Sequence, residues 1–97
     1  MHYHNTIFFP PELINLGAQD LVSILISAEE SLRREEFEGG LVLDTIQYST
    51  VSRSLSFGSR GGPATRVVRF FAKHFNCPLT QDWLSDGFSR GRLNALP

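Results

Sequence analysis

The clearest structural signal in this chain is a glycine-rich turn that leads into an amphipathic helix. The stretch LSFGSRGGPATRVVRFFAKHF, residues 55–75, begins at the end of an expected strand. It continues through three glycines and enters an expected helix at Pro63. Proline is well tolerated at the first position of a helix, because the N–H that it lacks would have no intrahelical partner there. We therefore predict a helix over residues 63–75.

The turn before this helix, Gly58–Ala64, has two interpretations. It is either a tight strand-to-helix connection or an anion site, since free N–H groups converge at a helix N-terminus. Arg60 and Arg66 flank this turn, and Arg69 lies one helical turn further on, so that all three could supply positive charge to an anion. Its nearest analogue is the glycine-rich turn of acyl-CoA-binding acetyltransferases. A proline stands where a further glycine would be wanted, so no family is assigned.

Two faces of the predicted helix differ in their chemistry. One face carries apolar side chains at helical spacing: Val67, Val68, Phe71 and Phe75. The other carries a basic stripe: Arg66, Arg69 and Lys73. Phe70 lies beside the stripe, so we expect its ring to be partly exposed. A basic stripe beside an aromatic side chain is typical of some nucleic-acid surfaces, and it also occurs on ordinary amphipathic helices.

The first 40 residues read as a strand followed by helix. HNTIFF, residues 4–9, has strand composition, and the two prolines after it end the strand. Apolar residues then recur at helical spacing over residues 12–36. Gly17 divides this stretch into a short helix and a longer one that restarts near Gln19 or Asp20. The pair Gly39-Gly40 is expected to stop the longer helix.

Residues 41–57 have the composition of β structure. LVLDTI is the expected first strand of a hairpin, QYST its turn, and VSRSLSF its second strand. Arg53 falls on the apolar side of that strand, so we place it at a sheet edge or opposite Asp44. The turn has no Asn-Gly or Asp-Gly pair, and one long bent strand is the alternative.

The C-terminal part is predicted to contain a short helix. In the segment TQDWLSDG, Thr80 is a suitable N-cap and Gly87 a suitable end. A DNA-reading helix-turn-helix is not supported, because this second helix would carry Asp82 and Asp86 but no base. The basic tail FSRGRLNALP, which follows, is short and is expected to be frayed at its end. It is either a docking peptide or a segment that Phe88 and Leu93 tether to the core.

Together these elements predict an α+β fold. A small antiparallel sheet of about three strands packs against two main helices, and a short C-terminal helix follows. The length of 97 residues allows one hydrophobic core, so residues 1–97 are expected to form a single domain. Its mobile ends are expected at residues 1–3 and 90–97.

The formal net charge of −1 hides an asymmetry. Residues 1–50 carry eight acidic and two basic side chains, whereas residues 51–97 carry two acidic and seven basic ones. Such a division either marks a surface for an acidic partner or nucleic acid, or means that the two halves neutralise each other in the fold. Arginine predominates among the bases, which favours carboxylate or phosphate recognition.

No pattern typical of an enzyme is present. His2 with His4, and His74 with Cys77, have the spacing of metal ligands, but neither pair has an obvious third ligand. We therefore predict no catalytic residue, no metal and no cofactor. The single cysteine and the lack of a signal-peptide or membrane-spanning pattern predict a cytoplasmic protein that does not contact a membrane.

By elimination, the sequence favours a regulatory domain that binds a macromolecule. The first hypothesis is a protein partner, for example a nucleic-acid-processing enzyme that this domain inhibits or modulates. The second is direct nucleic-acid binding by the arginine-rich half, and the third is a small-anion or acyl-CoA site at the glycine-rich turn. The candidate binding residues are Arg60, Gly61, Gly62, Arg66, Arg69, Phe70, Lys73, Arg90 and Arg92.

Overall fold

The computed structural model describes residues 1–13, 16–35 and 41–97. In chain order its elements are β1 (His2–Phe8), the 3-10 turn η1 (Pro11–Leu13), α1 (Ala18–Glu35), β2 (Val42–Ser49), β3 (Ser54–Arg60), α2 (Thr65–Phe75), β4 (Leu79–Ser85) and β5 (Arg90–Ala95). None of the helices in these ranges is long and apolar enough to cross a membrane.

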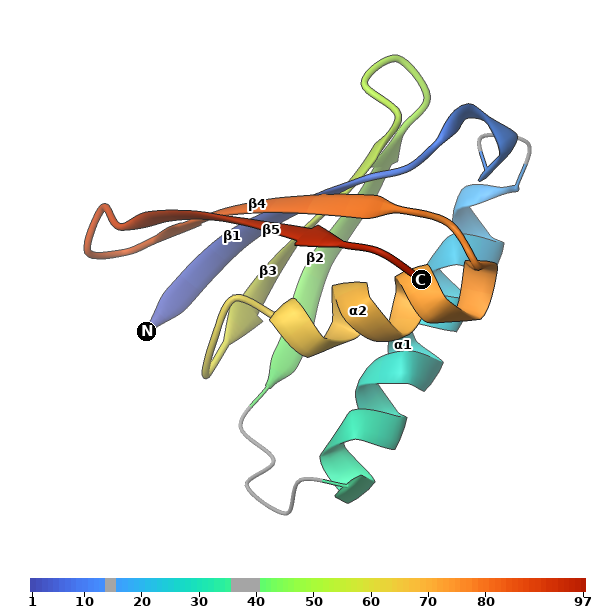
Figure 1. Cartoon of the computed structure of the whole chain (residues 1–97). Helices are drawn as coiled ribbons and strands as arrows, with labels where there is room; N and C mark the ends of the chain where they lie inside the picture. The colour runs from blue at the N-terminus through green and yellow to red at the C-terminus, as the bar shows by residue number, and fades with distance from the viewer. Residues whose placement is uncertain (14–15, 36–40) are drawn as a thin grey trace.

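The strands form one antiparallel sheet in the order β2-β3-β1-β4-β5, so β1 is its central strand. Both helices lie on the same face of the sheet, which twists strongly across its width (Figure 1). Up to β4, the order of elements is that of the ferredoxin-like, or split βαβ, motif. A hairpin then adds β5 at one edge, and the face opposite the helices is left open.

The predicted α+β class is correct, but the predicted sheet of about three strands is wrong, because the sheet has five. The predicted short C-terminal helix is also wrong, since that segment forms β4. Leu79 and Gln81 are buried and alternate with the more exposed Thr80 and Asp82, which is the period of a strand. The segment 90–97, predicted as a mobile end, contains β5, and β1 begins at His2, inside the other predicted mobile end.

The hairpin of β2 and β3 is present, but its turn lies later than predicted. β2 continues to Ser49, and Arg53 belongs to the turn, where it is exposed and has a φ of 52°. The predicted pairing of Arg53 with Asp44 is therefore wrong. Asp44 lies opposite Gly58 instead, and its carboxylate occupies the space where a Cβ of that glycine would lie.

The predicted helix boundary at a glycine agrees with the structure, and the one predicted at a proline does not. The predicted break at Gly17 is confirmed, because η1 precedes it and α1 follows it. Asn76 closes α2 in the left-handed conformation, with a φ of 53°. α2 begins at Thr65 and not at Pro63, because Ala64 also adopts a left-handed conformation. The predicted stop at Gly39-Gly40 lies outside the described residues.

The hydrophobic core lies between the sheet and the two helices. Its fully buried apolar side chains are Ile7, Leu21, Leu25, Ala28, Leu55, Val67, Val68, Phe71 and Ala72. The predicted inward positions Val67, Val68 and Phe71 are thus confirmed. The ring centroid of Phe71 lies 5.2 Å from that of Phe9 and 4.8 Å from that of Phe75.

A chain of buried polar side chains crosses the three central strands beneath the start of α2. Asn5 Nδ2 donates to Ser59 Oγ at 2.8 Å, and Gln81 Nε2 donates to Asn5 Oδ1 at 3.0 Å. The outer members of the chain hold the loop before α2. Ser59 Oγ donates to the carbonyl of Gly62 at 2.5 Å, and Gln81 Nε2 also donates to the carbonyl of Pro63. These bonds tie the position of α2 to the sheet.

One acidic side chain of α1, Glu29, is buried with only 5% of its surface exposed. It forms an i,i+4 ion pair with Arg33 on the same helix. Arg33 Nε also donates to the carbonyl of Leu41 at 2.8 Å, which ties α1 to the residue before β2. Burial raises the pKa of Glu29 above its ordinary value of 4.5, and the charge of Arg33 opposes that rise.

We expect Glu29→Gln to weaken the pH dependence of stability. Because the pKa of Glu29 is higher in the folded than in the unfolded protein, its proton stabilises the fold below pH 4.5. That stabilisation is lost as the pH rises through the raised pKa. Guanidinium unfolding at a series of pH values measures this effect. As the pH rises through the pKa of Glu29, the free energy of unfolding of wild type should fall relative to that of Glu29→Gln. The exposed neighbour Glu30, changed to glutamine, is the control, and equal curves for wild type and Glu29→Gln would contradict the assignment.

Candidate binding groove on the open face of the sheet

The register of the strands defines which side chains lie on the open face. In β1, Asn5 and Ile7 are buried beneath the helices, so His4, Thr6 and Phe8 alternate with them on the open face. Because partners across an antiparallel sheet share a face, the residues paired with these positions lie there too. They include Ser54, Ser56, Gly58, Thr80, Asp82 and Leu84. Polar and small side chains therefore dominate the centre of this face.

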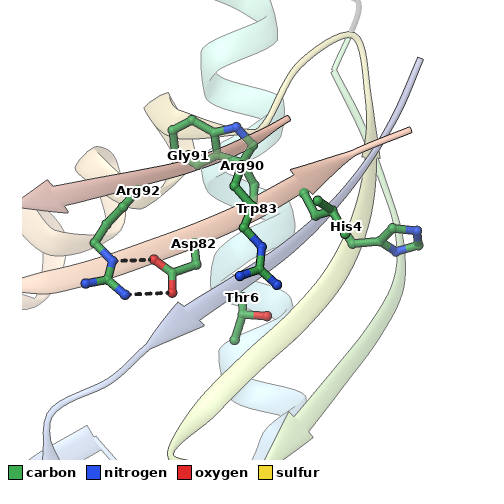
Figure 2. Close-up of a pocket in the computed structure, with 8 residues that line it drawn as sticks. His4, Thr6, Asp82, Trp83, Arg90, Gly91 and Arg92 are labelled. Carbon is green, nitrogen blue, oxygen red and sulfur yellow. Dashed lines mark hydrogen bonds and ion pairs between the residues drawn. The ribbon is translucent and has the colours of Figure 1, made fainter. Parts of the chain in front are cut away.

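A groove of about 560 Å³ lies on the open face where β1, β4 and β5 run side by side. It is lined by His4, Thr6, Asp82, Trp83, Leu84, Arg90, Gly91 and Arg92. Figure 2 shows the side chains of Arg90, Arg92, Asp82 and Thr6 on the same side of these strands. The groove thus combines two cations, one anion, a hydroxyl and an imidazole.

Arg92 and Asp82 form a two-pronged ion pair across the β4–β5 ladder. Arg92 donates from Nε to one carboxylate oxygen at 2.7 Å and from a terminal nitrogen to the other at 3.2 Å (Figure 2). The hydrogen bond from Arg92 lowers the pKa of Asp82, and the charges of Arg92 and Arg90 add to this effect against partial burial. Asp82 therefore stays ionised and holds the guanidinium of Arg92 in place.

Arg90 differs from Arg92 in having no such partner. It is exposed, and within the described part of the chain its guanidinium makes no hydrogen bond or ion pair. Its side chain extends over the sheet toward Thr6 (Figure 2). Arg90 is therefore the cation in the groove that is available to a carboxylate or phosphate of a ligand.

The β4–β5 hairpin that carries these arginines is held by its turn. Phe88 N–H donates to the carbonyl of Ser85, and Ser85 N–H to the carbonyl of Ser89, both at 2.9 Å. Phe88 has a φ of 61°, a conformation that glycine usually supplies in a three-residue hairpin loop. Phe88 is 88% exposed. The turn thus places an aromatic side chain in solvent at the tip of the hairpin.

On the other face of this hairpin, Trp83 covers Gly91. A Cβ on Gly91 would lie 2.0 Å from Cζ2 of the indole, so a side chain there would displace the ring. The indole lies against β5 on the side opposite Arg90 and Arg92 (Figure 2). Trp83 is the only tryptophan of the chain, and its position makes its fluorescence a reporter for events at β5.

The residues predicted to bind a partner fall on separate surfaces. Arg66, Arg69, Phe70 and Lys73 do lie together, and with Leu32 of α1 they line a second groove of about 310 Å³ on the helical side. Phe70 is 38% exposed, which confirms the prediction that it is partly exposed. Arg90 and Arg92 lie on the open face instead. Arg60 ends β3 on that face, opposite His2.

The predicted glycine-rich turn is smaller than the sequence indicated. Gly58 is a strand residue of β3, paired with His4. Gly61, with a φ of 88°, and Gly62 form the loop before α2. Two carbonyls of this loop, those of Gly62 and Pro63, accept hydrogen bonds from the buried polar chain. Ala64, the N-cap, makes no side-chain capping bond.

Sequence reasoning missed His4, Thr6, Asp82 and Leu84 as groove residues. The missing step was the assignment of β4 as a strand, since only its pairing with β1 and β5 brings these positions to Arg90 and Arg92. A weak local signal existed, because ten residues separate Asp82 from Arg92 and a Gly87 turn lies between them.

His74 and Cys77, which have the spacing of metal ligands, lie in different surroundings. Cys77 is buried, which raises the pKa of its thiol, and the charge of Glu12 adds to the rise. The ring of His74 stacks on that of Phe70, with centroids 6.5 Å apart. Over the described residues, no group of three histidine, cysteine or acidic side chains lies close enough to hold a metal ion.

The structure therefore defines a small α+β domain with an open-faced five-stranded sheet and a charged groove at its β4–β5 side. No protein-family model, curated protein or solved structure matches the chain.

Proposed function

We propose that the protein is a non-enzymatic binding module that docks an acidic segment of another protein in the open-face groove. The observation that carries this proposal is Arg90, which has no hydrogen-bond or ion-pair partner among the described residues and lies in a groove otherwise built from paired or neutral groups. A carboxylate of the partner would pair with Arg90 in the way that Asp82 pairs with Arg92. Leu84 adds apolar surface in the same groove.

Charge favours a protein over nucleic acid as the partner. The chain has a net charge of −1, and Asp82 cancels much of the charge of Arg92 in the groove. Nucleic-acid affinity depends on several phosphates being neutralised at once, and Arg90 is one cation within this groove. An acidic protein segment needs only one or two such contacts, with main-chain hydrogen bonds supplying the rest.

Single-stranded nucleic acid is the second candidate, because of the side chains of β1. His4 and Phe8, which is 37% exposed, lie on the open face of the central strand. They lie between Arg60 on β3 and Arg90 on β5. Rings on the central strands of an open sheet, with cations beside them, are how several modules stack unpaired bases.

Fluorescence anisotropy with labelled probes tests both candidates. We expect a glutamate-rich peptide to bind wild type, to bind less tightly as salt is raised, and to lose most of its affinity for Arg90→Ala. Arg69→Ala is the matched control, because it removes an exposed arginine from the helical groove. Tighter binding of a single-stranded oligonucleotide than of the peptide, lost in Arg90→Ala, would favour the second candidate. Equal loss in both variants, or no binding of either probe, would contradict the proposal.

A further inference from the structure

The two edges of the sheet differ in regularity. β2, at one edge, contains a register shift between Asp44 and Gln47, and Thr45 within it has a φ of 50°. Such a bulge bends an edge strand and hinders further pairing. β5, at the other edge, pairs with β4 without interruption from Leu79 with Ala95 to Leu84 with Arg90. β5 is therefore the edge better suited to accept another strand.

The hydrogen bonds near the turn show which backbone groups of β5 point outward. Ser85 N–H donates to the carbonyl of Ser89, so this pair is a hydrogen-bonded one. Bonded and non-bonded pairs alternate along an antiparallel ladder. On the far side of β4 the alternation agrees, because Asp86 N–H donates to the carbonyl of His2. It follows that the N–H and C=O groups of Arg90, Arg92 and Asn94 are directed away from β4, toward the free edge.

The side chains along this edge are amphipathic. Arg90, Arg92 and Asn94 lie on the open face. The opposite face has Gly91 under the indole of Trp83, followed by the half-buried Leu93. A strand added beside β5 would therefore have cations next to its side chains on one face and apolar surface next to those on the other.

We propose that β5 accepts a sixth strand, an extended segment of a partner protein in which acidic and apolar residues alternate. This inference rests on the proposed function and specifies how the acidic segment is held. The outward groups of β5 would form main-chain hydrogen bonds, and the acidic side chains would lie beside Arg90 and Arg92. A second copy of the chain fits less well, because antiparallel pairing of two β5 strands centred on Arg92 sets arginine against arginine.

The test uses a blocked peptide of alternating glutamate and valine, about nine residues long so that it exceeds the length of β5. A peptide of the same composition with all glutamates first has the same charge but no alternation. We expect only the alternating peptide to bind tightly, with a change in Trp83 fluorescence. If both peptides bind equally, the groove recognises charge alone, and the strand-addition proposal is wrong while the proposed function stands.

Asn94→Pro tests the main-chain bonds directly. Its N–H points outward, so proline removes a donor from the edge without removing a bond to β4. We expect Asn94→Pro to bind the alternating peptide up to about tenfold more weakly than the control Asn94→Ala, the loss expected for one hydrogen bond. Circular dichroism and the Tm of the two variants show whether both are folded.

Amide hydrogen exchange in wild type keeps the proposal testable if Asn94→Pro fails to fold. The peptide should slow exchange of the Arg92 and Asn94 amides, whose N–H groups face the edge, and leave that of Leu93, already bonded to β4, nearly unchanged. Unchanged exchange at Arg92 and Asn94 in a saturated complex would overturn strand addition. Self-association of the protein without peptide, lost in Asn94→Pro, would overturn it in favour of a second copy as the occupant.

Discussion

Phe71→Ala should lower the free energy of unfolding by about 3–5 kcal/mol, because it deletes a fully buried ring. The ring is packed between Phe9 and Phe75, whose own rings would lose a contact face when it is removed. A domain of this kind has a total stability of about 5–15 kcal/mol, so the variant would lie near the limit of folding. Chemical denaturation of wild type and variant measures the difference.

Phe70→Ala is the control for this prediction, because Phe70 is the next residue of the same helix and carries the same ring. Phe70 is 38% exposed and lines the helical groove, so we expect its free energy of unfolding to fall by about 1 kcal/mol or less. Similar losses of unfolding free energy at the two positions would mean that α2 does not bury the face that carries Phe71. A loss of 1 kcal/mol corresponds to a Tm change of about 4–8 °C for this size, so thermal unfolding separates the two variants.

The contrast between Phe70 and Phe71 could be predicted from sequence because it depends on local periodicity. The spacing of Val67, Val68 and Phe71 defines one face of a helix whatever the rest of the chain does. The left-handed Asn76 at the end of α2 is similarly local. The start of α2 was predicted two residues early, since nothing in the sequence marks Ala64 as the left-handed residue.

β4 could not be predicted in the same way, because its inward face is not apolar. The apolar residues of LTQDWLS stand at positions 79, 83 and 84, a spacing that fits a helix, and Gln81 hides the alternation of a strand. Gln81 is buried because Asn5, 76 residues away, accepts a hydrogen bond from it. β5 was not predicted for a similar reason. One of its inward positions is Gly91, which Trp83 covers, so no apolar side chain marks that position in the sequence.

The groove could not be predicted from sequence for the same reason, because β4 was not recognised as a strand. The sequence offered Arg90 and Arg92 as binding residues, but as part of a frayed tail. Once β4 is a strand, Asp82 lies opposite Arg92, and His4 lies beside Leu84 on the same face. The groove is therefore a consequence of the sheet order, and no local motif encodes it.

Asn5→Ala is expected to cost about 2–4 kcal/mol, although it removes only a small polar side chain. Asn5 is 1% exposed and is the middle member of the buried polar chain. When the Asn5 side chain is removed, Ser59 Oγ loses a hydrogen-bond donor and Gln81 Nε2 loses an acceptor. Both residues are fully buried, so water does not replace the lost bonds. Thr6→Ala, one residue along on the open face, is the control and should have a small effect. Comparable losses of unfolding free energy in the two variants would contradict the stabilising role given to the hydrogen-bonded side chains of Asn5, Ser59 and Gln81.

Asn5→Asp separates loss of hydrogen bonds from simple loss of packing. A carboxyl group of the same shape would be buried there, and burial would raise its pKa in the folded protein. The variant should therefore be closest to wild type at low pH and lose stability relative to wild type as the pH rises through that pKa. Asn5→Ala should show no such pH-dependent difference from wild type. If the two variants respond to pH alike, the site is open to solvent, and the buried chain does not hold the loop before α2 as described.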